Sequence, residues 1–436
     1  MDFDTQDSQQ RMQRRQQRAQ QRAQQRKLRQ QKARVRLFIA CAALLATGIL
    51  IAIIAVQGQE NQPPTEVQTV PTQVTVPPTT GPAASQAQTV IHLAAAGDLN
   101  VTDRTVASGG ELLYDYSKVF ADVSHLLSEA DYAVLNFEGN LSGQPYGTQT
   151  GSAPTELAQA LADMGVDLVQ TANSASIRAG LLGLTSTLNT LQTLGLQSLG
   201  TYESNADFRS GGGYIIQEVE GIRIGFVAFT KGMDSLGLPD GSENCVNILY
   251  EDYSSTYKTV DRQRITGILR SLEDQNPDIT VAMVHWGSEH YDSISDTQKE
   301  IRSLMLQNGV DVILGTHPHL LHSIEFDEEA GTLVAWSLGD FFGNATEPGS
   351  AYSIVLNLEI TKDNATGVTR VTGFTYTPIY TIQPEESFTG QLMVMRTEEA
   401  IKLYENKFLG AVSKSVYDSM LYSLERVEER IHTPVE

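Results

Sequence analysis

The fold and topology of this chain are limited above all by a run of 20 residues without a charge, Leu37–Val56 (LFIACAALLATGILIAIIAV). A helix of about 20 apolar residues is long enough to span the hydrocarbon core of a bilayer. Arg34 and Arg36 stand just before the run, and nine more Lys and Arg lie upstream. Because basic flanks stay in the cytoplasm, the sequence predicts a single-pass cell-membrane protein with a cytoplasmic N-terminus and an extracytoplasmic globular part.

A cleaved signal peptide is the alternative interpretation of the same segment. It would need a very long basic n-region and an apolar run longer than a usual signal core. It would also need an A-x-A cleavage site, and no clear one precedes the residues that follow the run. A retained membrane anchor is therefore the preferred prediction.

Composition divides the chain into five parts. Residues 57–88 are rich in Pro, Thr, Gln and Val, which is typical of an extended spacer. The predicted parts are a basic low-complexity cytoplasmic tail (1–36), a transmembrane helix (37–56), a linker (57–88), a folded domain (89–395) and a C-terminal helical extension (396–436).

The net charge of −21 is distributed unevenly. Residues 1–36 hold 11 of the 31 Lys and Arg and three of the 52 acids, which leaves 20 bases against 49 acids, a net of −29, for the rest. An acidic body of this kind argues against a nucleic-acid partner and suits a domain that faces water. Because Cys41 lies in the apolar run, the two cysteines do not form a disulfide framework.

Strand-like and helix-like segments alternate beyond residue 89. Apolar runs such as Val90–Ala96, Ile279–Val284 and Val310–Leu314 are separated by helical patterns such as Leu181–Leu194. Alternation of this kind predicts an α/β sheet covered by helices. A polar helical tail is expected over about Glu398–Glu429.

Polar side chains recur just after the C-terminal ends of the apolar runs, where open α/β sheets form their binding sites. Taken singly, a Gly-Asp pair is a common turn and a lone histidine is usually structural, so the inference depends on their repeated placement after successive strands. Histidine nitrogens together with carboxylate oxygens suit Mn, Zn or Fe, whereas Mg prefers oxygen alone. The candidate metal ligands are Asp98, Glu138, Asn173, His285, His317 and His319.

Several motifs from about Ile91 to Ile379 carry a family resemblance. The segments VHWGSEHY, GVDVILGTHPHLLHSIE and LVAWSLGDFF follow one another in the C-terminal half, and AAAGDLN and LNFEGNLS lie upstream. Together they resemble the bacterial capsule-synthesis CapA (poly-gamma-glutamate biosynthesis) family. This resemblance implies a calcineurin-like metallophosphatase fold, an α/β/β/α sandwich in which one carboxylate bridges two metals.

Carried over by position, the resemblance gives each candidate a role. Asp98 and His319 would ligate one metal, and Glu138 would bridge both. The second metal would be held by the remaining three candidates, Asn173, His285 and His317.

The chain departs from the family pattern in the Asn-Asn-His motif, which reads Asn173-Ser174-Ala175 here. Alanine neither donates a proton nor binds a metal, and loss of a general acid typically lowers a rate about 10²–10⁴-fold. Arg178 replaces a common family Asp, and Asp340 replaces the Asn of Ser-Leu-Gly-Asn. Asn100 stands where classical phosphatases have a histidine, and His290 and His322 are the nearby histidines that are candidates to substitute.

Three functions remain open from the sequence. The first is a role in the synthesis, export or anchoring of an anionic capsule polymer such as poly-gamma-glutamate, with the membrane and other capsule-synthesis membrane proteins as partners. The second is an extracytoplasmic metal-dependent phosphoesterase or other hydrolase. The third is a catalytically degenerate binding domain of the same fold. Ala175 shifts the balance away from the hydrolase.

Overall fold

The structure is a computed structural model that describes residues 87–435 except 111–112, 388–389 and 409–411. The predicted cytoplasmic tail, the predicted transmembrane helix and nearly all of the predicted linker lie outside these residues. Among the residues that are described, no helix has the length and apolar character needed to cross a membrane.

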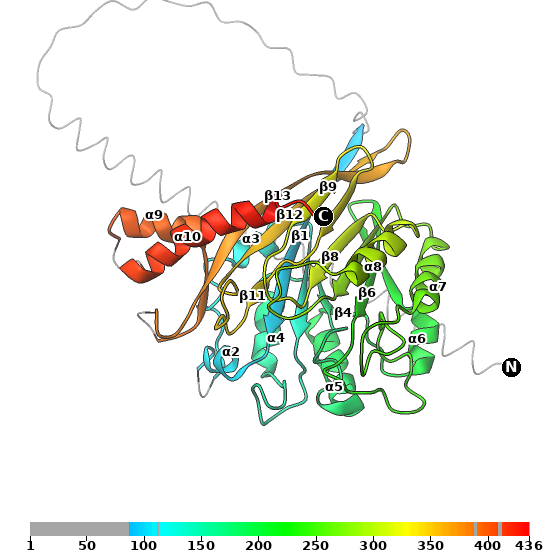
Figure 1. Ribbon diagram of the computed structural model, residues 1–436, viewed down its shortest axis with the longest axis horizontal. Coiled ribbons are helices and arrows are strands. Elements are labelled where there is room, and N and C mark those ends of the chain that lie inside the picture. The colour runs from blue at the N-terminus through cyan, green and yellow to red at the C-terminus, as the bar shows by residue number, and fades with distance from the viewer. Residues whose placement is uncertain (1–86, 111–112, 388–389, 409–411, 436) are drawn as a thin grey trace, which may run out of the picture. The chain divides into compact units, whose positions relative to one another are not determined.

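The larger sheet has eight strands within the described residues (Figure 1). Its central strand β1 pairs in parallel with β2 on one side and antiparallel with β12 on the other. A short strand, β11, pairs with the C-terminal end of β1. In order across the sheet the strands are β14 (Met393–Arg396), β13 (Thr369–Ile382), β12 (Tyr352–Asp363), β1 (Gln88–Asn100), β2 (Tyr132–Glu138), β3 (Leu168–Gln170) and β4 (Gln197–Leu199), with β11 at Asp340–Phe342.

The smaller sheet has six strands in the part of the chain that the structure covers. Its parallel centre consists of β6, β7, β8 and β10, with an antiparallel strand at each edge. In order the strands are β5 (Tyr214–Val219), β6 (Ile222–Thr230), β7 (Ile279–His285), β8 (Val312–Thr316), β10 (Thr332–Ala335) and β9 (Ile324–Asp327).

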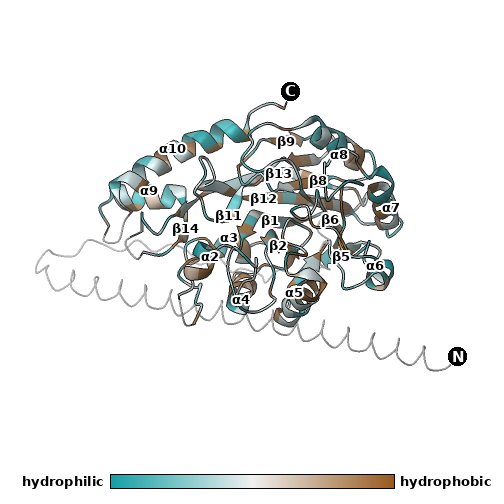
Figure 2. Cartoon of the chain, turned by 60° about the horizontal axis from the view of Figure 1, so that its bottom comes forward, coloured by the Kyte–Doolittle hydropathy of each residue, from teal (hydrophilic) through white to brown (hydrophobic). Residues whose placement is uncertain are grey.

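The described helices are α2 (Asp103–Ala107), α3 (Ser124–Ser128), α4 (Thr155–Asp163), α5 (Gly180–Leu194), α6 (Asn205–Gly211), α7 (Arg262–Glu273), α8 (Asp296–Leu306), α9 (Thr397–Glu405) and α10 (Lys414–Ile431). Helix α4 covers the outer face of the larger sheet and helices α7 and α8 cover that of the smaller sheet, whereas α9 and α10 pack on the side of the larger sheet that faces the core between the sheets. Helices α7 and α10 are hydrophilic over much of their length, whereas apolar residues are concentrated among the central strands (Figure 2).

Alternate residues of each central strand enter different cores, because successive side chains point to opposite faces of a sheet. In β1, Leu93 and Ala95 belong to the core between the sheets, whereas Ala94 packs with α4 on the outer side. In β7, Met283 faces the core between the sheets and Val284 packs with α7 and α8. Strands covered on both faces read as nearly continuous apolar runs. The predicted α/β sandwich is confirmed.

The C-terminal tail differs from its prediction as one helical stretch over 398–429. It forms two helices, α9 and α10, whose buried residues pack on β12 and β13. The break follows from local chemistry. Lys407 has a left-handed backbone (φ 56°), and the Ser413 side chain accepts a hydrogen bond from Val416 N to begin a new helix.

Candidate metal centre

The C-terminal ends of strands from both sheets meet at one place. Asp98 lies near the end of β1 and Glu138 ends β2, while His285 ends β7 in the other sheet. His317 and His319 follow β8, whose last residue, Thr316, pairs with His285. The polar residues predicted at the ends of successive strands therefore come together where the two sheets meet.

Five of the six predicted ligands form two overlapping groups. Ligand atoms of Glu138, His285 and His317 all lie within 4.8 Å of one another, and so do those of Asp98, Glu138 and His319. Glu138 belongs to both groups. If each group bound a cation, Glu138 would be the ligand that the two cations share.

Asn173 is buried beside the same strand ends, but its amide is already hydrogen-bonded. Its Nδ2 donates to Asn136 Oδ1 (2.9 Å) and to the carbonyl oxygen of Phe137 (2.7 Å), and its Oδ1 accepts from Ala175 N (3.1 Å). An amide oxygen has two lone pairs, so one remains for another partner. The predicted role of Asn173 as a metal ligand stays a prediction.

Hydrogen bonds hold the Asp98 carboxylate in place. Its Oδ1 accepts from Asn136 Nδ2 (2.5 Å), and its Oδ2 accepts from His317 N (3.0 Å). Gly97 makes this arrangement possible, because a Cβ there would lie 1.8 Å from the carbonyl oxygen of Gly339. That carbonyl accepts a hydrogen bond from Asp98 N at 2.9 Å, so a side chain at position 97 would separate β1 from the loop before β11.

The two nitrogens of His285 have different surroundings. Nδ1 lies 3.1 Å from Thr316 Oγ1, whereas Nε2 lies 3.6 Å from Glu138 Oε1 and 3.1 Å from Ser174 Oγ. In the tautomer whose Nδ1 donates to Thr316, Nε2 keeps its lone pair on the side of Glu138. Such an outer hydrogen bond is the usual way in which a protein orients a metal-binding histidine.

The loop after β8 is held in an uncommon backbone conformation. His317 and His319 have φ angles of 94° and 58°, in the left-handed region that few non-glycine residues adopt. Their ring centroids lie 6.1 Å apart, and the His317 ring lies 4.5 Å from that of His285. Backbone strain of this kind is concentrated at functional sites.

Burial and mutual charge shift the acid–base equilibria of the group. Burial raises the pKa of Asp98 to about 6, although His319 opposes the shift. Burial also acts to raise the pKa of Glu138, but the combined effect of His285, His319 and Arg178 lowers it to about 2. Carboxylates with shifted pKa values are concentrated at functional sites, and here they stand beside histidines at the strand ends.

The two histidines after β8 also diverge. Burial lowers the pKa of His317 well below its usual value, and the positive charges around it add to this effect. Burial acts in the same direction on His319, but the charge and hydrogen bond of Asp340 raise its pKa well above the usual value. The neutral imidazole of His317 is the form that binds a cation.

Buried polar atoms without a partner test whether the site fits a metal ion. Glu138 Oε2, His317 Nδ1 and Asn100 Oδ1 are buried without a hydrogen-bond partner among the described residues. Leaving a buried polar atom unpaired costs about 1–3 kcal/mol, and a cation would satisfy the first two. The donor set of imidazoles and carboxylates fits Mn, Zn or Fe. The residues present therefore fit a divalent metal centre.

The departures from the family pattern lie in and around this centre. Ala175 is fully buried, and Arg178 forms an ion pair with Asp234. Asn100 Nδ2 donates to Asp340 Oδ1 at 2.9 Å, so these two substituted positions bond to each other. Arg178 is close enough for its charge to lower the pKa of Glu138.

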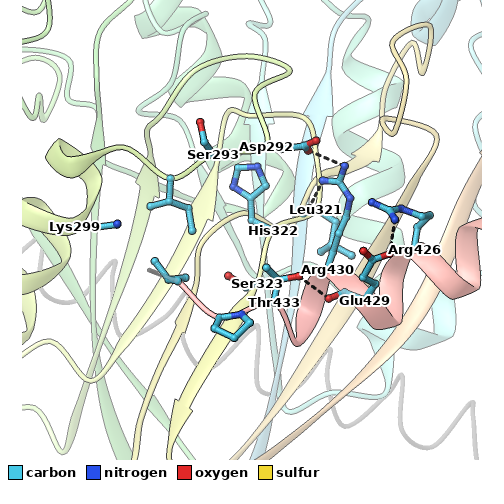
Figure 3. Close-up of a pocket in the computed structure, with 13 residues that line it drawn as sticks. Asp292, Ser293, Lys299, Leu321, His322, Ser323, Arg426, Glu429, Arg430 and Thr433 are labelled. Carbon is cyan, nitrogen blue, oxygen red and sulfur yellow. Dashed lines mark hydrogen bonds and ion pairs between the residues drawn. The ribbon is translucent and has the colours of Figure 1, made fainter.

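Of the two candidate substitute histidines, the structure brings only one to the centre. The ring centroid of His290 lies 5.4 Å from that of His319. His322 lines a different pocket of about 360 Å³ beside the end of α10, together with Asp292 and Arg430 (Figure 3). There its Nε2 is hydrogen-bonded to the Tyr291 carbonyl oxygen at 3.0 Å.

A second cavity, of about 280 Å³, adjoins the metal centre through His317. Lys231, which also lines it, is absent from the sequence-based set of site residues. Its position in the sequence is comparable to that of a predicted ligand, because Lys231 directly follows β6, just as His285 ends β7. A search limited to metal-ligating residue types excludes a lysine.

The chain is a two-sheet α/β sandwich with a candidate divalent metal centre. Carboxylates from the larger sheet and histidines from the smaller sheet form this centre. The family described as "Bacterial capsule synthesis protein PGA_cap" matches residues 92–345, which include all six predicted ligands. The chain belongs to this family, and the resemblance to CapA proteins is confirmed.

Two curated relatives carry the CapA name. The chain is 26% identical over 259 residues to "PGA biosynthesis protein CapA" of Bacillus subtilis (strain 168), covering 58% of this chain and 64% of that protein. It is 25% identical over 240 residues to "Capsule biosynthesis protein CapA" of Bacillus anthracis, covering 52% of this chain and 54% of that protein. The chain thus matches less than two thirds of either relative.

Solved structures give only distant likenesses. One is a novel phosphatase from Mycoplasma pneumoniae, with a TM-score of 0.40, 14% identity and coverage of 67% of this chain and 94% of that one. Another is a hypothetical protein from Thermus thermophilus, with a TM-score of 0.39, 16% identity and coverage of 66% and 98%. Likeness at this level assigns no function.

Proposed function

We propose that this chain takes part in the synthesis, export or anchoring of an anionic capsule polymer such as poly-gamma-glutamate, and that a divalent metal centre serves this role. The observation that carries the proposal is that the segment matched to the capsule-synthesis family contains the two groups that share Glu138. The names of the two CapA relatives support the polymer assignment.

We also propose that the run 37–56 anchors the chain in the cell membrane, with the folded part on the extracytoplasmic side. The basic residues before the run support this orientation. In this position the chain would meet a growing polymer and other membrane proteins of its synthesis. The charge of −29 beyond residue 36 opposes contact with a polyanion, so the cations of the metal centre and nearby basic side chains would have to provide the attraction.

A second candidate function is a metal-dependent hydrolase of the calcineurin-like metallophosphatase type. Glu138 favours it, because a carboxylate shared by two ligand groups suits a pair of cations. Such a pair, when bound, supplies a Lewis acid and an activated water. The chain's own residues would hold the cations from two sides, Asp98 and Glu138 from one sheet and His285 and His317 from the other. Ala175 supplies no proton to a leaving group.

The test uses full-length protein with His317→Ala and His319→Ala, and His432→Ala as a matched exposed control. Metal content is measured after purification and after reconstitution with Mn or Zn. Near-stoichiometric metal in the wild type and the control, and a lower metal content in each site variant, is the expected result, because His317 and His319 belong to different ligand groups. Wild-type protein that takes up no metal would refute the metal centre.

The same variants then separate the two functions in cells that lack the gene. We expect wild type and His432→Ala to restore cell-associated polymer, and the two site variants, at equal protein levels, to fail. Restoration by the variants with reduced metal content would leave a scaffold as the role. Turnover of phosphoesters by wild type alone would favour the hydrolase.

A further inference from the structure

The cavity beside the metal centre has its own set of polar side chains. His317 belongs both to this cavity and to one of the metal-ligand groups. Ser174 connects the two as well, since it lines the cavity and its Oγ lies 3.1 Å from His285 Nε2. A ligand in this space would therefore be in contact with both regions. The lining consists of Ser174, Lys231, Gly232, Asp234, Tyr257, Ser288, Glu289 and His317.

Lys231 is the cationic residue of this lining, and the backbone fixes its position. It follows β6 directly, and its N–H donates to the carbonyl oxygen of His285 at 2.8 Å. Its Nζ donates to the carbonyl oxygen of Gly287 at 2.7 Å and lies 4.7 Å from the centroid of the Tyr257 ring. The ammonium group is thus held at the end of the sheet, within the residues that also position the metal ligands.

Among the residues that the structure describes, Lys231 Nζ makes one hydrogen bond, which leaves donors for a ligand or for water. An ammonium group has three N–H donors, and Gly287 accepts from one of them. A purely structural role, in which Lys231 links the ends of two strands, accounts for that one bond and for the contact with Tyr257. It does not account for the placement of the group against an open cavity.

Among the described residues, no ion pair joins Lys231 to either carboxylate of the cavity. Asp234 is paired with Arg178, and Glu289 is an exposed residue of the rim. A partly buried cation that its neighbours leave undercompensated gains from an anionic partner.

We propose that Lys231, with Ser174, forms a binding subsite for an oxyanion, a carboxylate or a phosphate, on a ligand that also reaches the metal centre. The inference rests on the proposed function, because it requires the metal centre beside the cavity. It adds the chemical class of the ligand and a residue that selects it. The positive charge of Lys231 would also allow an acidic domain to bind part of a polyanion at this cavity.

The test compares full-length wild type with Lys231→Met, Lys231→Arg and the exposed control Lys258→Met, all loaded with Mn. Binding of inorganic phosphate and of gamma-linked diglutamate is measured by calorimetry, which distinguishes the two sources of the oxyanion. Metal content is measured on the same samples. Lys258 lies next to Tyr257 in the same loop, so the control removes the same charge close to the cavity.

We expect Lys231→Met to weaken binding of the preferred anion at least about tenfold, the effect of losing one hydrogen bond to a charged group. Lys231→Arg should remain closer to wild type because it keeps the positive charge, and Lys258→Met should match wild type. The metal content of all four proteins should be equal.

Two outcomes would overturn the subsite and leave the metal centre intact. One is unchanged anion affinity in Lys231→Met with full metal content. The other is loss of metal in Lys231→Met, which would make the lysine a structural support. Absence of metal in the wild type is a separate result that refutes the proposed function itself, together with the subsite that rests on it.

Discussion

Nδ1 of His319 lies 2.8 Å from Oδ1 of Asp340, so a predicted metal ligand is held by a carboxylate where the family motif has an asparagine. Asp340 lies in β11, which pairs with the end of β1 beside Asp98. The same carboxylate oxygen accepts from Asn100 Nδ2. Asp340 thus orients the histidine from outside the ligand groups.

Asp340→Asn should weaken metal binding about 10–100-fold, the usual effect of removing a carboxylate that supports a ligating histidine. The amide keeps a similar size, so the fold should be retained. Titration of the metal against a competing chelator measures the affinity. Glu329→Gln, at an exposed hairpin tip, removes the same charge as a control and should change nothing. An affinity for Asp340→Asn equal to wild type would show that Asp340 does not support the centre.

Glu138→Gln should abolish binding at both metal positions, because Glu138 belongs to both ligand groups. His285→Asn and His319→Asn each affect only one group, so each variant should keep about one metal if wild type holds two. Elemental analysis of the dialysed proteins gives the stoichiometry. A full complement of metal in Glu138→Gln would show that the Glu138 carboxylate is not needed at either metal position.

Stability should decrease with rising pH because of Asp311. Burial raises the pKa of Asp311 to about 6 from an ordinary value of 3.8. The folded state therefore holds its proton more tightly than the unfolded state, and stability falls as the pH rises from about 4 through 6. Asp311→Asn keeps an acceptor for Thr280 N, which lies 2.8 Å from Oδ2.

The Asp311→Asn variant should then be more stable than wild type at pH 7.5, by on the order of 1–3 kcal/mol, and equal to it near pH 4. Urea unfolding at the two pH values measures the difference. Glu329→Gln serves again as the exposed control. A difference that is the same at both pH values would exclude the titration of Asp311 as its cause.

Arg430 should anchor α10 to the domain. Its NH1 donates to the carbonyl oxygen of Leu321 at 2.8 Å, and its NH2 forms an ion pair with Asp292 at 2.7 Å (Figure 3). Arg430→Met should reduce the free energy of unfolding by about 1.5–3 kcal/mol, because it removes hydrogen bonds to and from a charged group. Lys414→Met, which breaks an exposed pair with Asp418 on the same helix, should leave the free energy of unfolding close to the wild-type value. Urea unfolding of the two variants beside wild type measures both changes, and equal losses would show that Arg430 is no special anchor.

The sequence predicted the strands that are buried on both faces of the sheet, because they form nearly continuous apolar runs. Ile279–Val284 and Val310–Leu314 are apolar nearly throughout because helices cover one side of β7 and β8 and the other sheet covers the opposite side. By contrast, β4 has only three residues, two of them half-buried, and its sequence carries no comparable signal.

The candidate site was predictable where residue type and position agreed, as for His285 after β7. Lys231 has a comparable position after β6, but the cavity beside it is formed by segments far apart in the chain, which the sequence does not reveal. His322 shows the reverse case. It lies three residues after His319 in the sequence, yet the loop carries it into the pocket beside α10.

The hydrogen bond between Asp98 and His317 N joins residues 219 positions apart. During synthesis the carboxylates at the ends of β1 and β2 are therefore added to the chain well before the histidines of the smaller sheet. Closing so long a loop costs conformational entropy, so contacts of such high sequence separation are slow to form. A chain that has not yet paired its two sheets presents carboxylates but no imidazoles, and it should bind a divalent cation weakly and without selectivity. Tight metal uptake would then report that the last long-range contacts of the domain have formed.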